Sequence, residues 1–202
     1  MTRPLLLLCI LFCGSLATAQ VVTIPDANLK SALVGDPAIN TNSDGEIQVT
    51  EAQAFTGTIS VGSQAIADMT GIEAFINLET LIVDNNDLTT LDISALTALT
   101  TLWCNNNDIT ALDLSGNTAL VELRCNNNDL TTLDLSNNTL LERLFCSDNN
   151  ALASIDLTGL TQAVSITLRN ASLTSIDVSD CTSLETLNLD GNGLTAIDVT
   201  AI

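Results

Sequence analysis

The sequence contains no histidine and no tyrosine, and it has one tryptophan and four phenylalanines among 202 residues. Without histidine there is no Ser-His-Asp triad, no imidazole metal ligand and no imidazole general base. Five Lys and Arg stand against 24 Asp and Glu, and the formal charge of −19 argues against nucleic acid. Apolar residues reach 46% with aromatics at only 2%, so the chain is not disordered, yet it lacks the rings of a conventional core.

The first nineteen residues are typical of a secretory signal peptide. Arg3 precedes an apolar run over 5–12, and Ala17-Thr18-Ala19 fits cleavage before Gln20. A membrane anchor would need about 18 apolar residues, and Gly14 interrupts this run too early. We therefore expect residues 1–19 to be removed and the protein to be secreted or surface-exposed, without membrane insertion.

The remainder of the sequence is dominated by a repeat of 21 residues. The segment 99–107 recurs at 120–128 and again at 141–149. Two steps of 22 residues contain single-residue insertions, one near Gly71 and one at Asn150-Ala151. Seven positions are equivalent: Val61, Val83, Cys104, Cys125, Cys146, Leu168 and Leu189. This period predicts a solenoid of seven coils over residues 56–202.

The pattern LxxLxCxxNxLTxLDLSxNT resembles the leucine-rich repeats of secreted bacterial proteins of the internalin type, in particular the Cys-containing repeats of the internalin J-like group. The resemblance implies a leucine-rich repeat solenoid with a parallel β-sheet on its concave face and a small helical cap at its N-terminus. Twenty-one residues leave no room for a helix on the outer side, so we expect an extended or irregular outer chain and shallow curvature.

Two columns of the repeat face the predicted core. The asparagine column is expected to satisfy backbone groups where the chain turns inward, and Ala171 breaks it, which should weaken that turn. Its members are Asn86, Asn107, Asn128, Asn149 and Asn192. The cysteine column places Cys104, Cys125 and Cys146 with their side chains parallel, which predicts buried free thiols rather than disulfides. Cys181 lies in the outer turn, where we expect a more reactive thiol.

Two further columns are predicted to face outward. The acidic column consists of Asp92, Asp113, Asp134, Asp156, Asp177 and Asp198. It is interpreted as a solvated face, with weak divalent-cation binding as the alternative. The threonine column consists of Thr89, Thr110, Thr131, Thr174 and Thr195, and it suits strand structure or, as a further alternative, an ice-binding surface.

Residues 20–55 are predicted to cap the solenoid. Pro25-Asp26 starts an expected helix, and Thr50 with Gln53 forms an expected capping box. The intervening segment matches an EF-hand loop, and internalin-type proteins begin with an EF-hand-like cap, so the resemblance extends here. Candidate calcium ligands are Asn40, Asn42, Asp44, Glu46, Gln48 and Glu51. Position 1 holds Asn40 in place of Asp, so we expect modest calcium affinity at best.

No acid–base pair or activated nucleophile stands out, so the chain is predicted to be non-enzymatic. We expect a monomeric binding module that recognises a protein or a glycan through its concave face. Candidate ligand-binding residues are Ile82, Trp103, Arg124, Arg143, Phe145 and Arg169. Their expected acidic rim consists of Glu79, Asp84, Glu122, Glu142 and Asp148.

One alternative function is a targeting or structural domain of a larger secreted enzyme or adhesin. The sequence ends at Ile202 inside the seventh coil with no polar cap, which predicts either a fragment or a covered edge.

Overall fold

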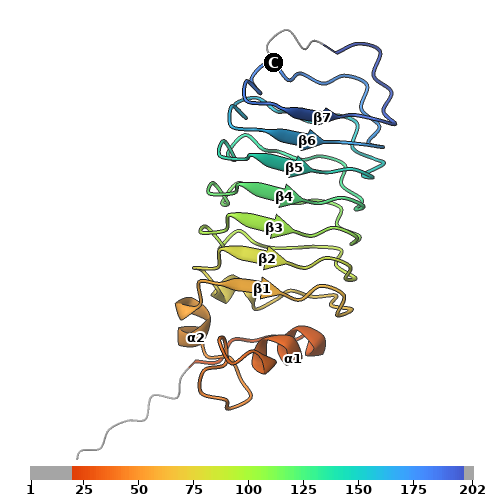
Figure 1. The fold of residues 1–202 in the computed structure, drawn as a ribbon. Helices are drawn as coiled ribbons and strands as arrows, with labels where there is room; N and C mark the ends of the chain where they lie inside the picture. The colour runs from red at the N-terminus through yellow and green to blue at the C-terminus, as the bar shows by residue number, and fades with distance from the viewer. Residues whose placement is uncertain (1–19, 198–202) are drawn as a thin grey trace, which may run out of the picture.

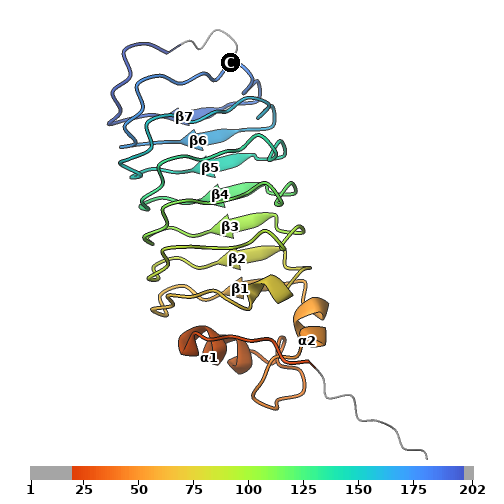
Figure 2. The same ribbon diagram turned by 180° about the vertical axis from the view of Figure 1, so that it is seen from behind.

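The computed structural model describes residues 20–197, so the predicted signal peptide and Asp198 lie outside the described residues. The repeats form one parallel sheet of seven strands in sequential order. The strands are β1 Thr58–Ser60, β2 Thr80–Ile82, β3 Thr101–Trp103, β4 Glu122–Arg124, β5 Arg143–Phe145, β6 Ser165–Thr167 and β7 Thr186–Asn188. Figures 1 and 2 show the coils stacked in a nearly straight column. The predicted leucine-rich repeat solenoid is confirmed.

The register follows the repeat without slippage from β1 to β7. Leu102 of β3 pairs with Leu81 on one side and Leu123 on the other, and all three side chains are fully buried. Residues on either side of this column point away from the core because side chains alternate along a strand. The outward side of β1–β7 is called the sheet face below.

The outer side of the coils contains turns and irregular chain, as expected for so short a repeat. The 3₁₀-helix η1, Ile72–Ala74, occupies the first 22-residue step. Its N-cap Gly71 has φ 105°, and a Cβ there would lie 2.7 Å from Ile24 Cγ1. Glycine therefore permits both the left-handed backbone and the close approach of the cap.

The acidic column has a structural role on the outer side. Asp113 Oδ1 accepts a hydrogen bond from Ser115 N at 2.9 Å, and Asp92, Asp134, Asp156 and Asp177 make the same contact two residues on. Hydrogen bonds from the Ser115 hydroxyl and N–H hold the pKa of Asp113 below its usual range. Each carboxylate thus stabilises the turn that follows it.

The asparagine column forms the predicted ladder of buried amides. Asn128 Nδ2 donates to the carbonyls of Cys104 and Cys125, and its Oδ1 accepts from Ile109 N in the preceding coil. Asn86, Asn107 and Asn149 repeat this arrangement and are also buried. Each amide therefore connects two coils and leaves few backbone groups of the turn unpaired.

Ala171 interrupts the amide ladder at the second 22-residue step. In other coils, the backbone N–H at the position of Leu152 donates to the asparagine side chain of the next coil. Leu152 N instead donates to Asn149 O, at 3.0 Å, inside its own coil. Asn150 and Ala151, where the single extra residue lies, form the turn that allows this bond. The weakening expected at this turn is offset by a local hydrogen bond.

The cap contains two helices, α1 Ala27–Gly35 and α2 Val49–Ala54. Asp26 is the N-cap of α1, as the sequence predicted, and its Oδ1 accepts from Asn28 N and Leu29 N. The capping box of α2 is formed by Gln48 and Glu51, so the prediction of Thr50 and Gln53 was wrong by two residues. Glu51 accepts a hydrogen bond from Gln48 N, which starts the helix two residues earlier than predicted.

Asp26 also joins the cap to the first coil. Its Oδ2 accepts from Ala67 N at 2.9 Å, and Asn28 Nδ2 donates to Ala65 O. Burial acts to raise the pKa of Asp26, but hydrogen bonds from Leu29, Ala67 and Asn28 outweigh it and lower the pKa. A lowered pKa means that Asp26 stabilises the cap above the ordinary carboxyl range and loses this contribution as the pH falls through its folded pKa.

The cysteines of the described residues are free and buried. Cys104, Cys125 and Cys146 lie in the core column, as predicted, and burial raises the pKa of the Cys104 thiol. Cys181 lies in the outer turn as expected, but it is fully buried and burial raises its pKa. The prediction of a more reactive Cys181 was therefore wrong, because the outer turn packs against the core.

We predict that all four thiols are protected in the native protein and react with a thiol reagent only after denaturation. Mass spectrometry without reduction should give the mass of the fully reduced polypeptide. A disulfide between any two of Cys104, Cys125 and Cys146 would contradict the parallel side-chain column.

Candidate binding surface on the parallel sheet

The predicted binding residues lie on the sheet face in the expected register. Ile82 pairs with Trp103, Trp103 with Arg124, and Arg124 with Phe145, on the neighbouring strands β2 to β5. All four side chains are partly exposed. The period of 21 residues brings them together because each occupies the last position of its strand.

Arg124 lies between two aromatic rings. Its Cζ is 4.2 Å from the ring centroid of Trp103 and 4.9 Å from that of Phe145. A guanidinium over an aromatic face is attracted by the ring quadrupole and packs well against it. The three side chains therefore form a continuous stack across β3, β4 and β5.

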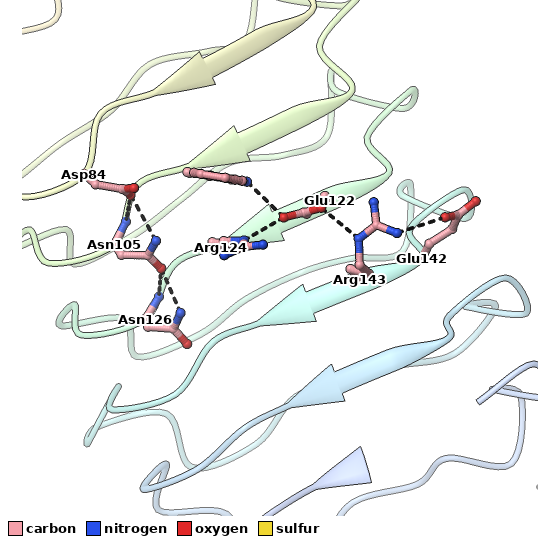
Figure 3. Close-up of polar contacts among 8 residues, drawn as sticks. Asp84, Asn105, Glu122, Arg124, Asn126, Glu142 and Arg143 are labelled. Carbon is pink, nitrogen blue, oxygen red and sulfur yellow. Dashed lines mark hydrogen bonds and ion pairs between the residues drawn. The ribbon is translucent and has the colours of Figure 1, made fainter. Parts of the chain in front are cut away.

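Glu122 lies at the centre of this surface and not on its rim, so its predicted position was wrong. Its Oε1 accepts hydrogen bonds from Trp103 Nε1 at 3.0 Å and from Arg124 Nε at 2.6 Å. Its Oε2 accepts from Arg143 Nε at 2.7 Å (Figure 3). We call Trp103, Glu122, Arg124, Arg143 and Phe145 the aromatic–arginine patch.

The charge of Glu122 is stabilised by its partners. Burial acts to raise its pKa, but hydrogen bonds from Arg143 and Arg124 and the charges of both residues leave the pKa below the usual value. Glu122 is thus an ionised, buried carboxylate that holds three side chains in place. Charge-assisted bonds of this kind are stronger than neutral ones.

The other predicted arginines occupy the same face. Arg143 precedes Phe145 by two residues and also lies 3.5 Å from Glu142, between Nη1 and Oε2. Arg169 is exposed one coil beyond the patch, with its Nε 4.0 Å from Asp190 Oδ2. The structure therefore brings Arg143 into the patch and leaves Arg169 at its margin.

A ladder of amides borders the patch on one side. Asn105 N and Nδ2 donate to Asp84 Oδ1, and Asn126 N and Nδ2 donate to Asn105 Oδ1 (Figure 3). Ser147 N continues the ladder by donating to Asn126 Oδ1. This ladder was not predicted from the sequence, although Asp84, Asn105 and Asn126 occupy equivalent positions of the repeat.

The residue between the amide ladder and the buried asparagine also has a defined role in these three coils. Asn85, Asn106 and Asn127 have φ of 55°, 54° and 53°. Asparagine tolerates this left-handed region better than most residues. In each turn at the edge of the patch, one asparagine therefore adopts the left-handed backbone conformation and the next one supplies the buried amide.

The predicted calcium loop is closed by its own hydrogen bonds. Glu51 Oε1 accepts from Thr41 N at 2.8 Å and from Asn42 N at 3.2 Å, while Oε2 accepts from Gln48 N at 3.0 Å. Asp44 Oδ2 accepts from Gln48 Nε2 and Asn42 Nδ2. These oxygens face N–H donors, so a calcium ion would have to displace those donors.

The remaining candidate ligands point elsewhere. Glu46 pairs with Lys30 of α1, with Oε2 2.6 Å from Nζ. Asn40 is buried and donates through Nδ2 to Val34 O. Within residues 20–197, no three His, Cys, Asp or Glu side chains come together as a group that could hold a metal. Most of the candidate oxygens are engaged by other groups in this arrangement, whereas Asn40 Oδ1 is buried without a hydrogen-bond partner among the described residues, and the calcium site stays a prediction.

Comparison with known protein families identifies the type of repeat. Residues 24–150 match the family model described as the LRR domain of endo-beta-N-acetylglucosaminidase EndoS. Residues 183–202 match a model described as Leucine Rich Repeat. The chain belongs to the leucine-rich repeat family. No curated protein sequence matches this leucine-rich repeat protein.

Solved structures place the repeat protein among internalin-like folds. The functional domain of InlJ from Listeria monocytogenes, described as including a cysteine ladder, is 30% identical with a TM-score of 0.68. The alignment covers 91% of this chain and 45% of that chain, so the repeat protein spans less than half of it. Internalin C2 from the same organism shares the fold at 21% identity and a TM-score of 0.63, over 93% of each chain.

Within the part of the chain that the structure describes, no helix is long and apolar enough to cross a membrane.

We predict that Glu51→Gln destabilises the cap in calcium-free buffer by about 1–2 kcal/mol, because the carboxylate that accepts three backbone N–H groups is replaced by an amide with one acceptor oxygen. Thermal unfolding followed by circular dichroism measures the effect. Glu185→Gln, which removes the same charge from an exposed position, serves as the control and should shift stability by less than about 0.5 kcal/mol.

The wild-type chain and Glu51→Gln also test the calcium prediction. If the loop binds calcium, millimolar calcium raises the melting temperature of the wild-type chain and leaves Glu51→Gln unchanged. Identical melting curves of the wild type with and without calcium would contradict the site.

Proposed function

We propose that this chain is a secreted or surface-exposed binding module that recognises a protein or glycan through the sheet face. In this proposal it is monomeric and has no catalytic activity of its own. The binding surface consists of the aromatic–arginine patch together with Ile82 and Arg169 at its two margins.

The observation that carries the proposal is the stack of Trp103, Arg124 and Phe145 on the open side of the sheet. Tryptophan and arginine are the residue types most enriched at binding hot spots. The sequence holds one tryptophan and five basic residues, and three of those basic residues lie on this face. The tryptophan and most of the few basic residues are therefore concentrated on one surface that a partner can reach.

Rigidity supports the same conclusion. Glu122 holds Trp103, Arg124 and Arg143 through hydrogen bonds of 3.0 Å or less, and the parallel strands hold their backbones in register. Side chains already ordered in the free protein lose little conformational entropy when a partner binds. The patch is therefore built as a pre-formed contact surface.

A second candidate function is a targeting or structural domain of a larger secreted enzyme. The match of residues 24–150 to the repeat domain of a protein described as an endo-beta-N-acetylglucosaminidase favours it. In this case the sheet face would bind the substrate of an attached catalytic domain or contact that domain. The complete reading frame of the natural gene distinguishes the two functions.

We predict that Trp103→Ala weakens partner binding by about 2 kcal/mol or more and leaves the melting temperature nearly unchanged. Partners are first selected with the wild-type chain on protein and glycan arrays, and the affinity of the variant for the selected partner is then measured by calorimetry.

Leu140→Ala is the control, because Leu140 is a large apolar side chain with 51% exposure that is not a member of the patch. It should bind as the wild type does. Loss of stability in Trp103→Ala with intact binding would instead assign the stack to support of the sheet.

A further inference from the structure

The guanidinium of Arg124 is only partly used inside the protein. Its Nε donates to Glu122, and its faces lie against Trp103 and Phe145. Within residues 20–197, its Nη1 and Nη2 groups have no hydrogen-bond partner, and the side chain is 37% exposed. Arg143 differs, because it faces two carboxylates, Glu122 and Glu142.

We propose that the patch recognises a carboxylate of an acidic polypeptide, which Arg124 binds through Nη1 and Nη2 between the rings of Trp103 and Phe145. This inference rests on the proposed function and names the chemistry of its partner. The planar guanidinium matches a carboxylate in a two-bond arrangement, which gives both strength and direction.

The position of Arg124 is pre-set for this contact. The two rings and the Glu122 bond keep the guanidinium plane fixed, so the open edge points away from the occupied Nε edge. A fixed guanidinium loses less entropy on binding than a free surface arginine does.

Charge selects the location. Elsewhere on a chain of charge −19, an anionic group meets mainly like charges. Within residues 20–197, Arg124, Arg143 and Arg169 share the sheet face, where Glu122, Glu142 and Asp190 lie beside them, while Lys30 in the cap is paired with Glu46. The Nη edge of Arg124 is not used by these pairs, so a carboxylate of the partner is accepted at that edge.

The stack also favours a polypeptide over a sugar as the source of the carboxylate. A pyranose packs flat on an open aromatic face, but Arg124 covers one face of Trp103 and one face of Phe145. Beyond the two rings, Ile82 and Thr167 stand in register on the neighbouring strands. The patch thus presents ring edges and a guanidinium edge to the partner.

The single tryptophan provides a direct test. The full chain labelled with ¹⁵N has one indole N–H signal, from Trp103, and this N–H lies in the patch. Four probes are titrated: a capped peptide of alternating Gly and Glu, the same peptide with Gln, N-acetylneuraminic acid, and diacetylchitobiose. We expect the Glu peptide to shift the indole signal saturably and the Gln peptide to bind at least tenfold more weakly.

Variants identify the contact. Arg124→Gln and Arg124→Lys should each weaken the Glu peptide at least tenfold, the second because an ammonium group lacks the planar two-bond geometry. Lys30→Gln removes the same charge from the cap and should change the affinity less than twofold. Melting curves confirm that Arg124→Lys remains folded.

Several outcomes would overturn the inference. These are equal binding of the Glu and Gln peptides, an equal loss in Lys30→Gln, no shift with any probe, or a shift with the acidic sugar alone. The last outcome keeps a carboxylate site but assigns its source to a glycan. None of them refutes the proposed function, which fails only if Trp103→Ala leaves binding of the array-selected partner intact.

Discussion

The buried amide of the asparagine column, present in most coils, is the interaction on which the solenoid depends. Each side chain donates to carbonyls of two coils and accepts an N–H from the preceding one, as Asn107 does with Val83, Cys104 and Leu88. A turn buried without such partners would leave several polar groups unpaired, and each would cost about 1–3 kcal/mol. Where Ala171 replaces the amide, a one-residue insertion at Asn150-Ala151 in the preceding coil forms a local turn that pairs Leu152 N with Asn149 O. The period of the repeat is therefore a hydrogen-bonding requirement as much as a packing one.

The binding surface is a consequence of that period. Trp103, Arg124 and Phe145 are 21 residues apart in sequence, and a shift of one residue in any strand would turn a member of the stack into the core. Constant register also places Glu122 beside Arg143 in the next strand and two residues before Arg124 in its own. One buried carboxylate can then order a tryptophan and two arginines. The core contributes no functional side chain to this surface, but it fixes the spacing of the strands that carry the surface.

Most of the fold could be predicted from the sequence because the columns repeat. The core strands, the buried asparagines, the free cysteines and the row from Ile82 to Phe145 all follow from counting positions. Three features could not be read in this way. Glu122 looked like a rim acid because charged residues are seldom buried, and only its three partners make burial favourable. Cys181 is buried by packing of the outer turn, and Gln48 starts α2 because Glu51 reaches its backbone.

The most direct test of this account is the free energy of unfolding of Asn128→Ala compared with that of Asn127→Gly. Asn128→Ala removes the amide that serves Cys104, Cys125 and Ile109, and we expect a loss of about 2–4 kcal/mol in urea-induced unfolding. Asn127 is exposed and has φ 53°, which glycine also adopts, so Asn127→Gly should lose less than about 1 kcal/mol. Equal stability of the two variants would contradict the claim that the buried amide ladder holds the coils together.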